Sequence, residues 1–272
     1  MEKSKKLLYY CSYVPDAVLK AAGFEMISMH ELAGNIKGSA HLPGSPCSFI
    51  RFCCDIPYEE YDGVIFANCC NSSQRMYDYV KHHHPDIFTY IMEVPRDGNE
   101  KWDCQGLFHA LEQYFQSCVR VEPEIDKQHG EYPYPFDEKK DFLILSSALH
   151  QGYIEELERI FAGFTCKFLS CGSQKRGIMH LTGNAVACPR MLDFFAYIGG
   201  QIASAKGVIL VSIRNCDPML FAYPGIRAIC REKKIPCLMI EEEYGTVMSS
   251  RSCIRYEAFL EGFGWEQRNN DK

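Results

Sequence analysis

Short apolar runs alternate with amphipathic helical patterns along the whole chain, and this alternation restricts the fold more than any other feature. Strand-length apolar runs that are separated by helices are typical of parallel sheets, because each helix carries the chain back to start the next strand. The sequence therefore predicts an α/β protein. Strands are expected at 7–14, 24–29, 62–68 and 87–94, and again at 142–149, 164–170, 207–213 and 236–242.

The helical patterns and one polar segment divide this series into two similar parts. Segment 129–140 is polar and contains Pro133 and Pro135, which makes it the best candidate for a linker. We therefore predict two doubly wound, Rossmann-like parallel-sheet domains, 1–135 and 136–272, with a site in the interdomain cleft. Helices are expected near 15–22, 72–83, 101–118, 152–162, 189–204, 223–234 and 250–262.

Charge and composition exclude several classes of partner. The 272 residues carry a formal net charge of −6, so the chain lacks the basic excess that binds phosphates or anionic membranes. The basic N-terminus has too short an apolar stretch for a signal peptide or a membrane span. We expect a cytoplasmic protein with no nucleic-acid or membrane partner.

Fifteen cysteines are unusual for a chain without a secretion signal. In a reducing compartment they are not expected to form disulfides, and most are expected to be small buried apolar residues. Several, however, follow predicted strands, where α/β proteins bind ligands. Cys11 ends the first strand, Cys69 and Cys70 follow the third, and Cys216 follows the strand at 207–213, while Cys47 lies in the long loop before the third strand.

Thiolates from separate loops are soft ligands that select iron–sulfur clusters, zinc or copper(I). Structural zinc sites use closely paired cysteines, and this sequence has no CxxC pair. Spacing alone leaves two alternatives open, a metal site at Cys47, Cys70 and Cys216 or three unrelated core thiols.

Five segments in a fixed order resemble the 2-hydroxyacyl-CoA dehydratase and benzoyl-CoA reductase family. The first is YYCSYVPDAVLKAAGFEMISM (9–29), a strand and helix with a Pro followed by an acidic residue. The second and third are AHLPGSPCSFIR (40–51) and DGVIFANCCNSSQRMYDY (62–79). The fourth is CPRMLDF (188–194), and the last runs from GVILVSIRNCDP to CIRYEAFLE (207–261). The chain is shorter than is usual for this family.

The resemblance implies a [4Fe–4S] cluster held by three cysteines. Cys47 matches the cysteine before Ser-Phe-Ile-Arg, Cys70 rather than Cys69 matches the second ligand, and Cys216 matches the third. Asn71 stands where the family usually has Asp. Three ligands leave one iron open to substrate. The resemblance assigns no catalytic side chain.

The family relationship further implies a lyase of anaerobic metabolism, a subunit that dehydrates an acyl-CoA substrate by radical chemistry. Such enzymes combine two homologous subunits, here a heterodimer, with a separate ATP-dependent activator that donates the electron. Two alternatives are kept. One is a benzoyl-CoA reductase or double-cubane-type reductase subunit, which extra thiols near the ligands, such as Cys11, Cys53, Cys54 and Cys69, would favour. The other is a non-catalytic electron-relay or partner subunit.

Two further residues are expected to shape local structure rather than chemistry. Gly23 follows the first predicted helix and is expected to terminate it in the left-handed conformation. His150, with Ser146 and Ser147, does not stand in a GxSxG motif, so a capping or turn role is preferred over a hydrolase site.

Overall fold

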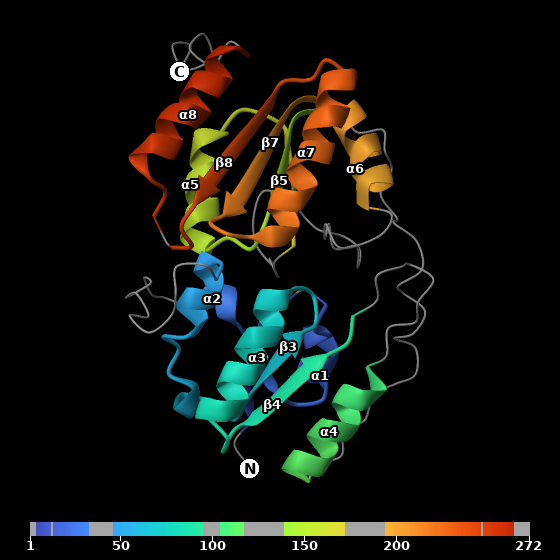
Figure 1. Cartoon of the computed structure of the whole chain (residues 1–272), viewed down its shortest axis with the longest axis vertical. Coiled ribbons are helices and arrows are strands. Elements are labelled where there is room, and N and C mark those ends of the chain that lie inside the picture. Colours follow the sequence, from blue (N-terminus) through green and yellow to red (C-terminus); the bar gives the residue numbers. More distant parts are fainter. Residues whose placement is uncertain are drawn as a thin grey trace.

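The computed structural model describes residues 4–11, 13–32, 46–94, 104–116, 139–171, 194–245 and 247–263. Within these ranges the chain forms two four-stranded sheets in which every strand pair is parallel (Figure 1). The predicted fold class, an α/β protein with two Rossmann-like sheets, is confirmed. The boundary predicted between residues 135 and 136 lies outside the described residues and stays a prediction.

The first sheet has the strand order β2-β1-β3-β4. All four predicted strands of this half are present, although each is shorter than its apolar run. The six-residue helix α2 was not predicted. In chain order the elements are β1 (Lys6–Tyr9), α1 (Asp16–Ala21), β2 (Glu25–Ser28), α2 (Ser48–Cys53), β3 (Gly63–Ala67), α3 (Asn71–His83), β4 (Phe88–Met92) and α4 (Gln105–Phe115).

The second sheet repeats this order as β6-β5-β7-β8. The helix predicted near 223–234 begins six residues earlier than expected, because Pro218 lies in its first turn, where a missing N–H is tolerated, and Pro224 is accommodated inside it. The elements are β5 (Lys140–Ser146), α5 (Gln151–Ile160), β6 (Cys166–Ser170), α6 (Phe194–Ala203), β7 (Ala205–Ile213), α7 (Asp217–Glu232), β8 (Cys237–Glu242) and α8 (Ser250–Glu261).

Successive strand residues alternate between two apolar layers, as the period of two in a strand requires. In β1, Leu7 packs with α1 and α4, whereas Leu8 packs on the side of α2 and α3. In β5, Leu143 packs with α6 and α7, whereas Ile144 packs with α5 and α8. Each sheet is therefore covered on both faces, and the layer containing α2 is continuous with the layer containing α5 and α8.

Helix α2 forms the junction between the two halves (Figure 1). The backbone N–H of Ser48 donates to the carbonyl of Arg214 at 3.0 Å, and its hydroxyl accepts from the backbone N–H of Tyr244 at 2.8 Å. Beside them, the Glu243 carboxylate accepts from Arg51 at 2.6 Å and from Arg214 at 2.7 Å. The start of α2 is thus attached directly to the ends of β7 and β8.

Two helices end in the same hydrogen-bonded motif with different residues at the left-handed position. After α1, Gly23 has φ +96° and donates to Lys20, while Phe24 donates to Leu19, which confirms its predicted role. After α7, Lys234 has φ +57°, with equivalent hydrogen bonds from Lys234 to Arg231 and from Ile235 to Cys230. A lysine there carries a steric cost that glycine does not.

Replacing Lys234 with Gly is expected to raise the free energy of unfolding by about 1 kcal/mol, because the left-handed backbone no longer strains a side chain. The matched control is Lys233→Gly, one residue earlier, where φ is −83° and the backbone is right-handed. The control should lose roughly 0.5 kcal/mol, since glycine there only adds freedom to the unfolded chain. Urea denaturation of both variants measures the difference, and equal effects would contradict the assignment.

Replacing Ser48 with Ala is expected to destabilise the protein by roughly 1–3 kcal/mol, because the buried N–H of Tyr244 loses its acceptor. Ser250→Ala, at the exposed first residue of α8, is the control and should change stability by less than about 0.5 kcal/mol. Thermal and urea unfolding give both values. A neutral Ser48→Ala would show that this contact does not hold the halves together.

Candidate functional site

The residues that follow the strands of both sheets line one small pocket of about 50 Å³. Six cysteines are among them, which come from both halves of the chain. The side chains on its wall are Tyr10, Cys11, His30, Cys47, Phe49, Cys69, Cys70, Ser72, Ser147, Ala148, Cys171, Ile213, Asn215, Cys216, Asp217 and Pro218. Because the pocket is small, binding of a larger group requires these side chains to move apart.

Three of the cysteines occupy the same structural position, the N-cap of a helix. Cys47 precedes α2, Cys70 precedes α3 and Cys216 precedes α7. The Cys70 sulfur accepts a hydrogen bond from the Ser73 N–H at 3.4 Å, whereas the other two sulfurs lie near first-turn N–H groups without closing a cap hydrogen bond. Helix N-termini carry partial positive charge and favour anions. Three such ends therefore face one thiol-lined pocket.

Burial opposes the ionisation of these thiols. It raises the pKa of Cys47 to about 11, and nearby N–H groups and the Ser72 hydroxyl offset only part of this effect. Burial also raises the pKa of Cys216, and the proximity of Cys47 and Cys70 raises it further. All three cysteines line the same pocket.

The Tyr10 hydroxyl lies between two adjacent sulfurs in this pocket. It is 3.6 Å from Cys70 Sγ and accepts a hydrogen bond from Cys69 Sγ at 3.6 Å. The pKa of Cys70 is raised by its contact with Cys69 and by burial, and the hydrogen bonds from Tyr10 and Ser73 act in the opposite direction. Cys70 is therefore the sulfur on which the donors converge.

The three cysteines predicted as cluster ligands thus line the same pocket, together with Cys11 and Cys69. Two other thiols considered near the ligands do not line it: Cys53 contacts the Met29 sulfur at 3.8 Å and Cys54 the Met76 sulfur at 3.7 Å. The Cys-Pro segment at 188–194 lies almost entirely outside the described residues.

Sequence reasoning missed several residues of the wall, of which Cys171 and Tyr10 matter most for its chemistry. Cys171 follows β6 directly, so the rule that selected Cys11 and Cys216 could have found it. Tyr10 gave no signal, because a tyrosine at a strand end is usually an ordinary packing residue.

The spacing of these groups does not match a site for a single metal ion. Among the described residues, no three His, Cys, Asp or Glu side chains converge closely enough to hold one ion. A four-iron cluster places each cysteine on a different iron, so its ligand sulfurs are farther apart than the ligands of one ion.

Aromatic rings close the pocket on the side of α2. Phe49 stacks on His30 with ring centroids 4.4 Å apart, and Tyr244 meets Phe49 edge-on at 4.7 Å. The His30 Nε2–H donates to the Tyr10 carbonyl at 2.9 Å, so Nδ1 is left as an acceptor for the Tyr244 hydroxyl at 3.5 Å. Burial lowers the pKa of His30 to about 4. His30 and Phe49 line the pocket, and Tyr244 packs against both of them.

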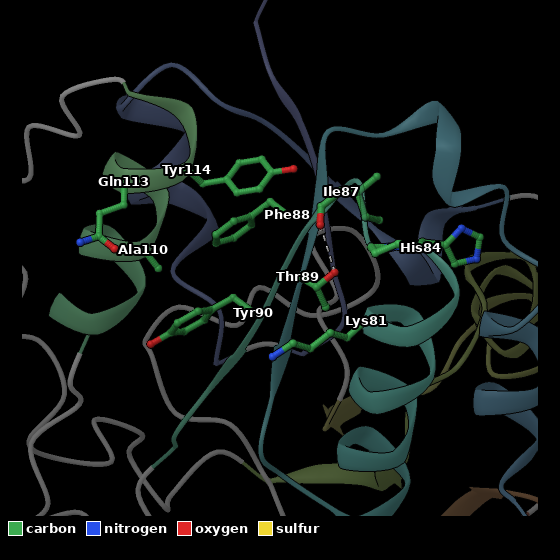
Figure 2. Close-up of a pocket in the computed structure, with 10 residues that line it drawn as sticks. Lys81, His84, Ile87, Phe88, Thr89, Tyr90, Ala110, Gln113 and Tyr114 are labelled. Carbon is green, nitrogen blue, oxygen red and sulfur yellow. Dashed lines mark hydrogen bonds between the residues drawn. The ribbon is translucent and has the colours of Figure 1, made fainter.

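A larger cavity, of about 460 Å³, lies elsewhere in the first half, along strand β4 between α3 and α4 (Figure 2). Phe88, Tyr90 and Tyr114 contribute its aromatic surface, and Lys81 contributes a charge that is directed to the Tyr77 hydroxyl. The residues that line it include no cysteine. Its chemistry offers no ligand for a soft metal, so the thiol pocket is the candidate site.

Two parallel sheets whose strand ends surround one pocket lined by six cysteines define the class of this protein, a two-part α/β protein with a thiol-lined pocket. A family model described as "2-hydroxyglutaryl-CoA dehydratase, D-component" matches residues 11–122 and 184–263, which is more than half of the chain. The chain belongs to this family, and the resemblance found in the sequence is confirmed.

Other comparisons add little. No curated protein sequence matches the chain. One solved structure, a mutant N-acetyl-L-ornithine transcarbamylase complexed with carbamyl phosphate and N-succinyl-L-norvaline, is 10% identical with a TM-score of 0.21. That similarity covers 89% of this chain and 66% of that chain, and it is too weak to carry a conclusion. Among the described residues, no helix has the length and apolar character needed to cross a bilayer.

The buried His30 makes the stability of the metal-free protein depend on pH. Its folded pKa of about 4 is below the ordinary value of 6.5, so the folded state binds this proton less readily than the unfolded state does. The stabilisation is complete above pH 6.5 and is lost as the pH falls toward 4, by up to roughly 3 kcal/mol. His30→Gln should unfold with a shallower pH dependence over this interval. Urea titrations at several pH values test this, and parallel profiles for the two proteins would disprove it.

Proposed function

We propose that this chain is the iron–sulfur subunit of a 2-hydroxyacyl-CoA dehydratase-type enzyme, a lyase, and that Cys47, Cys70 and Cys216 hold a [4Fe–4S] cluster. One observation carries the proposal: the three cysteines that match the family's ligand positions each cap a different helix around one pocket. The family match supports the dehydratase class. The cluster and its chemistry are the proposed part.

The donor set suits such a cluster in two respects. Thiolates are soft ligands that prefer iron–sulfur clusters, and they come from three separate loops that can contact separate irons. A cluster with thiolate ligands is anionic, and the N-terminal ends of α2, α3 and α7 offset negative charge at the three attachment points. When bound, the cluster would supply one-electron transfer and an iron open to a substrate oxygen.

The chain itself contributes position and an apolar part of the pocket wall. Ser48 fixes the start of α2 against Arg214 and Tyr244, so Cys47 from the first half is held near Cys216 from the second. Phe49 and His30 form this apolar part of the wall, and Tyr244 packs against Phe49. In these surroundings the electrostatic effects of the helix ends are stronger than they would be in water.

Partners follow from the family relationship. The matched family is a component of a dehydratase, which supports association with a homologous dehydratase subunit as a heterodimer. We further propose that an ATP-dependent activator donates the electron, that the substrate is an acyl-CoA thioester, and that the protein acts in the cytoplasm of an anaerobe. The 13 described cysteines are all free thiols.

A second candidate function is a reductase subunit of the double-cubane type. It is favoured by the three additional thiols in the pocket wall, Cys11, Cys69 and Cys171. More sulfur ligands than a single cubane needs would be explained by a larger cluster. A non-catalytic electron-relay or partner subunit is the third alternative, and turnover of an acyl-CoA by the assembled complex distinguishes it from the first.

Anaerobically purified protein should contain roughly four irons and four sulfides per chain, with broad visible absorption, if it holds one cubane. Ser in place of Cys47, Cys70 or Cys216 should abolish or degrade that absorption, because each change removes one ligand. The matched control is Cys166→Ser, at the start of β6, which should keep full iron. Iron and sulfide analysis and absorption spectra provide the measurement.

The opposite results are equally clear. Stoichiometric zinc in iron-free protein would exclude the cluster, and about eight irons per chain would favour the double-cubane alternative. Retention of an intact cluster in Cys216→Ser would contradict a site shared by the two halves. Loss of iron in Cys69→Ser together with retention in Cys70→Ser would move the ligand by one residue.

A further inference from the structure

Tyr10 places the only polar atom of its side chain among the pocket thiols. Its hydroxyl is 3.6 Å from both Cys69 Sγ and Cys70 Sγ. Tyr10 follows β1 and the two cysteines follow β3, and these strands are paired neighbours whose ends meet. The pairing of β1 with β3 therefore brings the Tyr10 hydroxyl close to the two sulfurs.

The ring is held on several sides, so the position of the hydroxyl is defined. Tyr10 stacks on Phe49 with a ring-centroid separation of 5.3 Å and an interplanar angle of 21°. On another side its ring centroid lies 6.3 Å from that of Phe66. Its carbonyl accepts the His30 hydrogen bond at 2.9 Å, which fixes the main chain. Packing of this kind would hold a phenylalanine equally well. The hydroxyl is the part of the residue that packing alone does not require.

The hydrogen bonds around this hydroxyl have a direction. Cys69 donates to the Tyr10 oxygen. The contact between the Tyr10 hydroxyl and Cys70 Sγ fits either atom as the donor, but a metal-bound Cys70 thiolate has no hydrogen, so Tyr10 is then the donor. Cys70 Sγ also accepts from the Ser73 N–H at the start of α3. The order of donors is thus Cys69 to Tyr10 to Cys70.

We propose that Tyr10 is a positioning residue that sets the reduction potential of the group bound at Cys70, and that Cys69 supports Tyr10 as a hydrogen-bond donor and is not a ligand. This inference rests on the proposed iron–sulfur function. A hydrogen bond to a ligand sulfur withdraws electron density and stabilises the reduced cluster, which carries one more negative charge. Removal of the donor therefore shifts the potential to a more negative value.

The inference also gives the adjacent cysteines different tasks. Cys70 lies at the N-cap of α3, and its sulfur accepts a hydrogen bond from the Ser73 N–H. Cys69, in contrast, donates its hydrogen to the Tyr10 oxygen.

The test is Tyr10→Phe in the anaerobically purified full chain. Iron and sulfide content should equal that of the parent protein, because no ligand is changed, while the midpoint potential from a redox titration followed by EPR should shift to a more negative value. Tyr77→Phe is the matched control, since that hydroxyl on α3 accepts from Lys81 and lies outside the pocket wall. Its potential should equal that of the parent.

Variants at Cys69 test the second donor separately. Cys69→Ser keeps a donor and should leave iron content and potential close to the parent values, whereas Cys69→Ala should keep the iron and shift the potential in the same direction as Tyr10→Phe, by less. An unchanged potential in Tyr10→Phe, or loss of iron from Cys69→Ala, would overturn the inference while leaving the iron–sulfur function in place. Absence of iron from the parent protein would instead show that the proposed function itself has failed.

Discussion

The hydrogen bond from the Ser48 N–H to the Arg214 carbonyl is the contact on which the geometry of the pocket depends. Ser48 immediately follows Cys47, and Arg214 lies two residues before Cys216, so one main-chain bond sets the separation of two cysteines from different halves. Tyr244 follows β8, and its N–H donates a second hydrogen bond at this junction, to the Ser48 hydroxyl. The residues that line this pocket come from both sheets. Hydrogen bonds between the two halves are therefore needed, because domain motion would otherwise separate the thiols.

The sequence was sufficient to predict the two sheets, but not helix α2 and its hydrogen bonds, which connect the two halves. All eight strands were predicted, because buried parallel strands are continuous apolar runs that differ clearly from the amphipathic helices around them. Helix α2 was missed because its six residues are too few to show a helical period, and four of its side chains are buried apolar groups or cysteine. The start of α7 was placed late because Pro224 suggests a helix beginning, whereas Pro218 marks the real first turn.

The same division applies to the candidate site. Cysteines that follow strands could be selected from the sequence, because the carboxyl ends of parallel strands share one edge. That rule brought Cys70 and Cys216 together correctly and should have included Cys171, which also lines the pocket. It could not exclude Cys53 and Cys54, because their contacts with methionine sulfurs depend on the packing of α2 and α3. Nor could it find Tyr10, whose importance depends on where its hydroxyl lies.

The electrostatics of the pocket favour a metal group over free thiol chemistry. A redox or nucleophilic cysteine needs a lowered pKa and access to solvent. Here burial raises the pKa of Cys47 and of Cys216. The N-terminal ends of the three helices favour the thiolate form of these cysteines, but they cannot outweigh that desolvation alone. These properties support the proposed cluster, in which metal ions would replace the thiol protons and the helix ends would face thiolates.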